Sequence, residues 1–148
     1  MRGAAVSVAG LVVGLLAGLH AAPPAVAGAR GATVLDHKGR WESGYGAQFY
    51  NVVGRLKNTS GHPLRWVKLR IDAVDSRGKV VASTETYNES AEALAVPDVK
   101  ADDLLASGKV KPLAADVEER FRASFLKEET PAFTDYRVTV VETPAAER

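Results

Sequence analysis

The segment from Leu64 to Asp75 carries the pattern that most restricts how this chain can fold. Apolar side chains occupy every second position, and Trp66, Lys68, Arg70 and Asp72 alternate with them. Side chains of a β-strand point alternately to the two faces, whereas a helix needs apolar neighbours three and four residues apart. The alternation therefore predicts a half-buried strand. Its inward positions are Val67, Leu69, Ile71 and Ala73.

Further segments show the same alternation and are separated by turns rich in Gly, Pro, Asn and Asp. Asp36–Gly46 holds three glycines and is predicted as a loop, and Asp98–Ser107 is predicted as a short helix that ends before Gly108. Strands are not interleaved with long helices, so the expected class is all-β. We expect an immunoglobulin-like β-sandwich of six to seven antiparallel strands with one short helical insertion. The predicted strands are 33–35, 47–58, 64–75, 79–86, 116–125 and 135–142.

Residues 1–27 differ from the rest of the chain and have the order of a secretory signal peptide. Arg2 precedes the uncharged run Ala4–Leu19, and Ala25-Val26-Ala27 forms an A-x-A cleavage site. An uncleaved membrane anchor is the alternative, but the run is shorter than the about 20 apolar residues of a spanning helix. We expect export to the periplasm or the extracellular space, with no membrane insertion after cleavage.

The remaining chain is expected to hold a flexible lead over 28–31, one domain over 32–143 and a tail over 144–148. Cleavage removes Arg2 and no acidic residue, so the mature net charge falls from +1 to zero. Such a balance argues against a nucleic-acid partner. The absence of cysteine excludes disulfides and thiolate chemistry.

The spacing of metal-ligating residues gives little support for a metal site. His37 and His62 lie in predicted loops, and neither combines with Asp36 or Glu42 in a ligand motif. A group of acidic residues near the predicted helix lacks the spacing of a calcium loop and is interpreted as helix capping and solvation. We therefore expect no metal and no cofactor. The acidic group is Asp98, Asp102 and Asp103.

Catalytic motifs are absent from the sequence. The sequence contains no G-x-S-x-G motif, and no base is placed beside a serine. The carboxylates of a glycosidase face each other across the scissile bond, whereas neighbours such as Glu118 and Glu119 on a strand point to opposite faces. We expect no catalytic residues and no enzyme. A small hydrolase of cell-wall or carbohydrate polymers is the less favoured alternative.

Two stretches resemble the FxLYD family of small exported bacterial domains. Gly54-Arg55-Leu56-Lys57-Asn58 precedes a polar turn, and Ile71-Asp72-Ala73-Val74-Asp75 precedes Gly78-Lys79-Val80-Val81. Lys111-Pro112-Leu113 and the later Phe121 are also similar to the family pattern. Only Asp75 matches the naming motif itself, and the segment 88–108 has no counterpart. The resemblance implies an immunoglobulin-like fold and export, and it brings no catalytic residues.

Four residues of these stretches are expected to be structural. Gly54 leaves room for a bulky side chain from the facing sheet or marks a bulge. Asn58 can bond the backbone of its own turn. Asp75 can accept turn N–H groups, and Gly78 suits the last position of a type I turn.

Trp66, Lys68 and Arg70 share the outward face of the strand 64–75 and are the candidate partner-binding residues. The alternative is that Trp66 covers a sheet edge beneath arginine stems, or that the segment 88–108 covers it. Trp41, in the glycine-rich loop, is expected to plug an open end of the sandwich. The expected function is a non-catalytic exported module that binds an envelope protein or peptide or supports an assembly. A purely structural accessory domain is the alternative.

Overall fold

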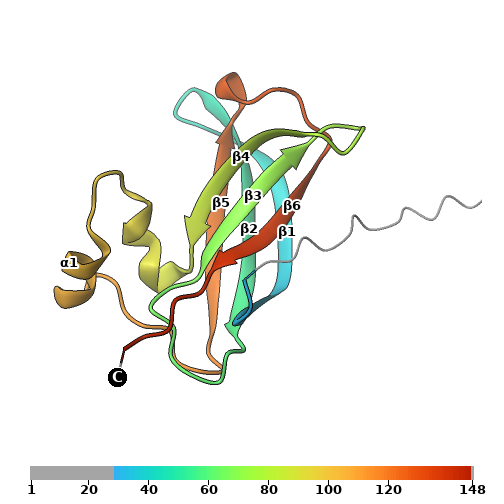
Figure 1. The fold of residues 1–148 in the computed structure, drawn as a ribbon. Helices are drawn as coiled ribbons and strands as arrows, with labels where there is room; N and C mark the ends of the chain where they lie inside the picture. The colour runs from blue at the N-terminus through green and yellow to red at the C-terminus, as the bar shows by residue number, and fades with distance from the viewer. Residues whose placement is uncertain (1–28, 148) are drawn as a thin grey trace, which may run out of the picture.

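The computed structural model describes residues 29–147, which form six strands and few helices. The strands make two antiparallel sheets of three strands each, in the orders β1–β2–β5 and β4–β3–β6 (Figure 1). The predicted all-β class is confirmed, whereas the signal peptide predicted over 1–27 lies outside the described residues. The strands are β1 (Ala32–Gly44), β2 (Ala47–Asn58), β3 (Lys68–Val74), β4 (Val80–Tyr87), β5 (Glu118–Leu126) and β6 (Asp135–Glu142).

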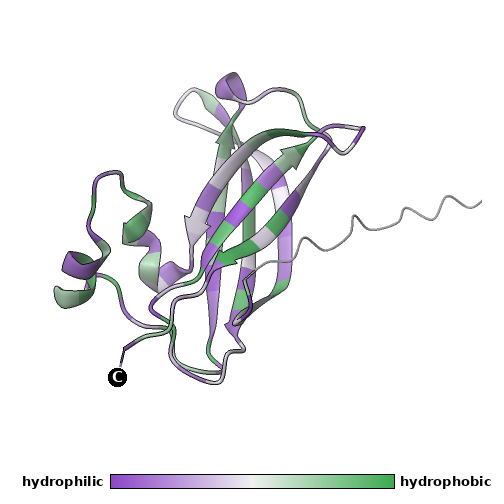
Figure 2. Ribbon diagram, in the orientation of Figure 1, coloured by the Kyte–Doolittle hydropathy of each residue, from purple (hydrophilic) through white to green (hydrophobic). Residues whose placement is uncertain are grey.

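Buried side chains from both sheets form one apolar core. Hydrophobic and hydrophilic residues alternate along the strands in Figure 2, as strands with one buried face require. The four inward positions predicted between Leu64 and Asp75 are all fully buried. That prediction is confirmed. The β1–β2–β5 sheet contributes Val52, Leu56, Phe121, Ala123 and Phe125 to the same core.

Strand β1 passes through the segment 36–46, which was predicted as a loop, and pairs with β2 along its length. The loop prediction was wrong. Glycines usually indicate that a strand is interrupted, but Gly39 and Gly44 lie within β1. Gly39 instead makes room for a ring, since a Cβ there would overlap the side chain of Tyr50. Only Tyr45 and Gly46 form the turn, with φ angles of 51° and 76°. Positive φ at both positions is what a two-residue type I′ hairpin requires.

Strand β3 begins later than predicted, at Lys68 rather than Leu64. Leu64 pairs elsewhere, through isolated antiparallel bridges to Leu113 and Ala145. The bridge to Ala145 follows the same antiparallel register as the β3–β6 pairing, so the chain before β3 stays beside the chain after β6. Arg65 N donates to Pro144 O at 2.8 Å in the same stretch. The residues predicted as a tail from 144 onward therefore include part of this small pairing.

The described part of the predicted lead is also bonded to its neighbours. Ala29 N donates to Val140 O at 2.8 Å, and Thr59 N donates to Gly31 O at 2.9 Å. These bonds join the start of the described chain to β6 and to the turn after β2.

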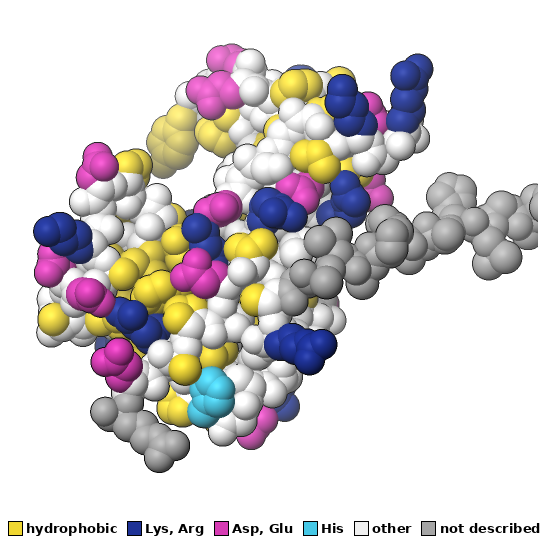
Figure 3. All heavy atoms as spheres, viewed as in Figure 1, with side chains coloured by type: hydrophobic (Ala, Val, Ile, Leu, Met, Phe, Trp, Pro, Cys, Tyr) yellow, Lys and Arg dark blue, Asp and Glu magenta, His cyan; other side chains and the backbone are white. Residues whose placement is uncertain are grey.

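A helical arm, defined as residues 88–113, connects β4 to β5 and contains η1 (Glu89–Ala95) and α1 (Ala101–Ala106). Helix α1 lies within the predicted helix 98–107 but is shorter. No helix in the part of the chain that the structure describes is long and apolar enough to cross a bilayer. Hydrophobic side chains gather where the arm meets the strands (Figure 3). This second cluster contains Ala91, Leu104 and Val110, with half-buried Trp66, Tyr87, Ala93, Leu94 and Leu105.

Candidate functional site

Trp66, the first of the candidate partner-binding residues, is half-buried beside the helical arm. Its ring packs against the second cluster, and its Nε1 donates a hydrogen bond to Glu142 Oε1 at 2.9 Å. The Arg65 guanidinium lies 4.8 Å from the ring centroid, within the range of a cation–π contact. The ring is therefore held by the chain's own residues on several sides.

Lys68 and Arg70, the other two predicted binding residues, already have partners on the β4–β3–β6 sheet. Lys68 Nζ lies 2.6 Å from Glu85 Oε2, and the hydrogen bond to that carboxylate raises the pKa of Lys68. Arg70 Nε lies 3.3 Å from the carboxylate of Asp72, which is only 6% exposed and also accepts a hydrogen bond from Ser83 Oγ. Both cations on this face are therefore neutralised by carboxylates of the same sheet.

Gly54 is required by a close approach within its own sheet. A Cβ at this position would meet the backbone oxygen of Asp36 and would lie 2.5 Å from Phe121 Cζ. Phe121 stands directly opposite on the neighbouring strand β5, not on the facing sheet as the sequence suggested. A bulge between Val34 and Asp36 adds to the crowding.

Asn58 is fully buried at the end of β2 and bonds two separate segments. Its Nδ2 donates to His62 O in the following turn and to Leu113 O and Ala114 O at the end of the arm. Its Oδ1 accepts from the N–H and hydroxyl of Ser60. The side chain therefore ties the local turn to a segment distant in sequence.

Asp75 and Gly78 shape the turn between β3 and β4. Asp75 Oδ1 accepts from Arg77 N at 2.9 Å and Lys79 N at 3.0 Å. Gly78 has a φ of 78°, which a residue with a Cβ rarely adopts. The turn geometry is thus set by these two residues.

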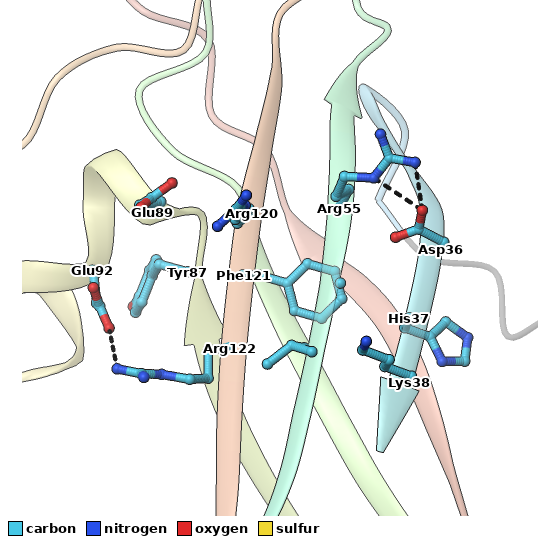
Figure 4. Close-up of a pocket in the computed structure, with 12 residues that line it drawn as sticks. Asp36, His37, Lys38, Arg55, Tyr87, Glu89, Glu92, Arg120, Phe121 and Arg122 are labelled. Carbon is cyan, nitrogen blue, oxygen red and sulfur yellow. Dashed lines mark hydrogen bonds and ion pairs between the residues drawn. The ribbon is translucent and has the colours of Figure 1, made fainter. Parts of the chain in front are cut away.

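A groove of about 690 Å³ lies against the β1–β2–β5 sheet, with η1 on one side (Figure 4). Val53, Phe121 and Tyr87 contribute apolar surface to it. Charged side chains from β1, β2, β5 and η1 surround this apolar part. They are Asp36, Lys38, Arg55, Glu89, Glu92, Arg120 and Arg122.

Two arginines of the groove are held by carboxylates. Arg55 Nε donates to Asp36 Oδ2 at 2.9 Å, and this bond lowers the pKa of Asp36. Arg55 also reaches Glu118 at 3.4 Å. Arg122 lies 3.8 Å from Glu92 of η1, so this ion pair spans the side of the groove (Figure 4).

Lys38 and Arg120 differ from these two arginines. Neither side chain makes an ion pair or a hydrogen bond with any residue between 29 and 147. Arg120 is also directly opposite Arg55 on the neighbouring strand. Like charges in opposite positions destabilise a sheet. The groove therefore presents two uncompensated cations beside an apolar surface, which suits an anionic ligand.

Several of the residues considered for metal binding have other partners. His37 Nδ1 is 2.7 Å from the Tyr136 hydroxyl, and Glu42 bonds Arg40 and Asn51. Asp102 lies 2.5 Å from Arg65 Nη2. Residues 29–147 contain no cluster of three or more His, Cys, Asp or Glu that would hold a metal ion.

The sequence alone did not bring the groove residues together. The polar face of β5, with Arg120 and Arg122, was visible in its alternation. The position of Lys38 beside this face was not visible, because the glycines of 36–46 indicate a loop. Had β1 been recognised as the hairpin partner of β2, the period of two would have placed Lys38 beside Val53.

Comparison with known proteins gives no match: no family model, no curated protein and no solved structure is significantly similar to this chain.

Proposed function

We propose that this chain is a non-catalytic binding module of an exported protein, and that the groove on the β1–β2–β5 sheet takes an acidic, extended segment of an envelope protein or peptide. The observation that carries this proposal is the pair of uncompensated cations, Lys38 and Arg120, beside apolar Val53. Carboxylates of a bound segment would neutralise these cations, and its apolar side chains would cover the groove surface.

A binding role accounts for the groove better than a hydrolase does. Two of the three carboxylates that line it are used structurally, since Asp36 bonds Arg55 and Glu92 pairs with Arg122. Glu89, the third, is exposed at the start of η1. A general acid needs a pKa near the working pH, whereas the bond from Arg55 lowers the pKa of Asp36. The lining therefore favours charge recognition over proton transfer.

The finer description of the fold belongs to the same proposal. An immunoglobulin-like sandwich of the FxLYD type is supported by the core that the two sheets share. It is also supported by the structural use of Gly54, Asn58 and the turn from Asp75 to Gly78. Export is supported by the pattern of charge, apolar run and A-x-A site within residues 1–27.

Binding of two synthetic peptides tests the proposal, one alternating Glu with Val and the other alternating Lys with Val. The chain lacking residues 1–27 is expected to bind the acidic peptide and to release it as salt is raised. Replacing both Lys38 and Arg120 with serine should weaken binding about tenfold or more, because each lost charge-assisted contact contributes on the order of 1 kcal/mol. Arg77→Ser, in the exposed β3–β4 turn, is the matched control and should have no effect.

Two results would contradict the groove proposal. The first is equal binding of the acidic and the basic peptide. The second is binding that survives loss of both cations but is lost in Trp66→Ala or Arg70→Ser, which would place the partner on the surface predicted from the sequence. A chain that binds neither peptide would favour the purely structural alternative.

A further inference from the structure

The outer edge of β1 is unpaired over a long stretch. This strand has 13 residues, and no backbone hydrogen bond outside its ladder with β2 involves residues 32–44 in the described chain. Most side chains between His37 and Ser43 are exposed. A long unpaired edge is a template for another strand.

The hairpin geometry fixes which backbone groups are free. Gly44 and Ala47 close a two-residue hairpin, so this pair exchanges hydrogen bonds across the ladder. Bonded pairs alternate along an antiparallel ladder, so Glu42, Arg40 and Lys38 also bond β2. The N–H and C=O groups of the residues between them point away from β2, and these residues are His37, Gly39, Trp41 and Ser43.

Two of the other three sheet edges face each other, and the third, β6, receives one backbone bond. The β4 and β5 edges meet, because Thr86 Oγ1 donates to Arg122 O at 2.6 Å and Asn88 bridges to Phe121. On β6, the carbonyl of Val140 accepts a bond from Ala29 N. Residues 37–44 of β1 receive no such backbone hydrogen bond from any other segment among residues 29–147.

Two aromatic residues on the same hairpin remain exposed. Trp41 contacts Tyr50 and Phe133 on one side, yet it remains 49% exposed. Tyr45 is fully exposed at the turn, with a φ of 51°, where Asn, Asp or Gly is normally preferred. Exposed aromatic residues beside an open edge are typical of an interface.

We propose that β1 pairs antiparallel with β1 of a second copy of this chain, in a register centred on Trp41. In this register Gly39 exchanges backbone bonds with Ser43 of the copy, and Trp41 with its own counterpart. Arg40 then lies opposite Glu42 of the copy in a non-bonded pair, where side chains approach most closely. The two-fold symmetry repeats that ion pair.

The order of charges along β1 selects this register. A pairing centred on Gly39 would place Lys38 opposite Arg40, and Asp36 opposite Glu42. A centre at Lys38, Arg40 or Glu42 would place that charged residue against its own copy, and like charges in opposite positions are destabilising. The Arg40 centre also places Lys38 opposite Glu42, but the register centred on Trp41 has two attractive pairs without that repulsion. A pairing centred on His37 meets the bulge between Val34 and Asp36. Charge complementarity therefore favours a second copy in one register.

Sedimentation of the chain lacking residues 1–27, over a range of concentrations, tests the proposal. The wild-type mass is expected to rise from the monomer value toward twice that value near about 1 mM. Pairing of two single edge strands buries a small area, so the association is weak. Arg40→Glu and Glu42→Arg should each keep the chain monomeric, since each places like charges opposite one another. The double variant restores opposite charges and should associate again.

Arg77→Glu is the matched charge control and should associate as the wild type does. Circular dichroism melting should show similar stability for all variants, because exposed ion pairs such as Arg40–Glu42 contribute little. A wild-type chain that stays monomeric at every concentration would overturn the proposal. So would single variants that associate like the wild type, or a double variant that fails to recover while still folded.

Discussion

The two sheets meet along two seams, one between β4 and β5 and the other between β1 and β6. Different contacts join the sheets at each seam. Along the β4–β5 seam, the fully buried Asn88 receives Val67 N on its Oδ1 at 2.7 Å and donates to Glu119 and Ser90. Along the β1–β6 seam, an exposed hydrogen bond between His37 and Tyr136 is the corresponding side-chain link. One seam is built from buried polar groups, and the other from exposed contacts.

Charged groups therefore have different uses in the two regions: those at the β4–β5 seam stabilise the fold, and those near β1 are accessible to a ligand or partner. Glu119 interrupts the apolar face of β5, and its carboxylate bonds Asn88 and the N–H and hydroxyl of Ser90. Such a group fixes the start of the helical arm. Lys38 and the free edge of β1 lie toward the other seam, where no such network forms in the described chain. We therefore expect substitutions at the β4–β5 seam to change stability and substitutions near β1 to change binding.

The largest expected effect is that of Asn88→Ala. The variant leaves Val67 N–H and the Glu119 carboxylate without their buried partner, so unfolding free energy should fall by about 2 to 4 kcal/mol. Urea denaturation measures this loss. Asn51→Ala, on the outer face of β2, is the matched control and should cost less than about 1 kcal/mol. Equal losses would remove the contrast between the two regions.

Gly54→Ala is expected to have the next largest effect. The new methyl group meets the backbone of Asp36 and the ring of Phe121, and overpacking of this kind costs about 1 to 3 kcal/mol. Gly44→Ala is the control, because a Cβ there contacts nothing within 4 Å. Combining Gly54→Ala with Phe121→Leu should cost less than the sum of the two single losses. Full additivity would show that the ring is not the obstacle.

A smaller contrast is expected between the two hydrogen bonds at the seams. Thr86→Val removes the donor to Arg122 O at the β4–β5 seam and should cost about 1 kcal/mol. Tyr136→Phe removes the exposed bond to His37 and should cost about half of that. Thermal melting compares the two variants. A larger loss in Tyr136→Phe would reverse the proposed order of the seams.

The smallest expected effect is a pH dependence at Asp36. Because Arg55 lowers the pKa of Asp36 in the folded chain, the carboxylate adds stability above its usual pKa of 3.8. This contribution is lost as pH falls from that value through the lower folded pKa. An NMR titration of the Asp36 carboxyl should show the low pKa in the wild type and a rise toward the usual value in Arg55→Gln. An unchanged pKa in that variant would contradict the assignment.

The sequence predicted those parts of the fold in which local pattern and packing agree. The segment 135–142 coincides with β6, and 47–58 coincides with β2, because each has a clear period of two between strong turn residues. The segment 36–46 was misassigned because Gly39 has a packing role under the Tyr50 ring that depends on a neighbouring strand, and because Gly44 lies within the strand.

The candidate site was harder to predict than the fold. Trp66 was expected on an open face, but the helical arm packs against it, and the position of that arm depends on long-range contacts. The groove depends on the register of three strands, since Lys38, Val53 and Arg122 stand in one row across β1, β2 and β5. A single sequence indicates which residues share a strand face and leaves open which strands are neighbours.

Amide hydrogen exchange in dilute solution tests the contrast between the seams most directly. Val67 N bonds the Asn88 side chain and Asn88 N bonds Val67 O, so both amides should exchange nearly as slowly as global unfolding allows. The outward amides of Gly39, Trp41 and Ser43 should exchange rapidly, because nothing in the described chain accepts from them. Equally slow exchange of both sets of amides in a dilute monomer would contradict the account, because the β1 edge would then be closed by the chain itself.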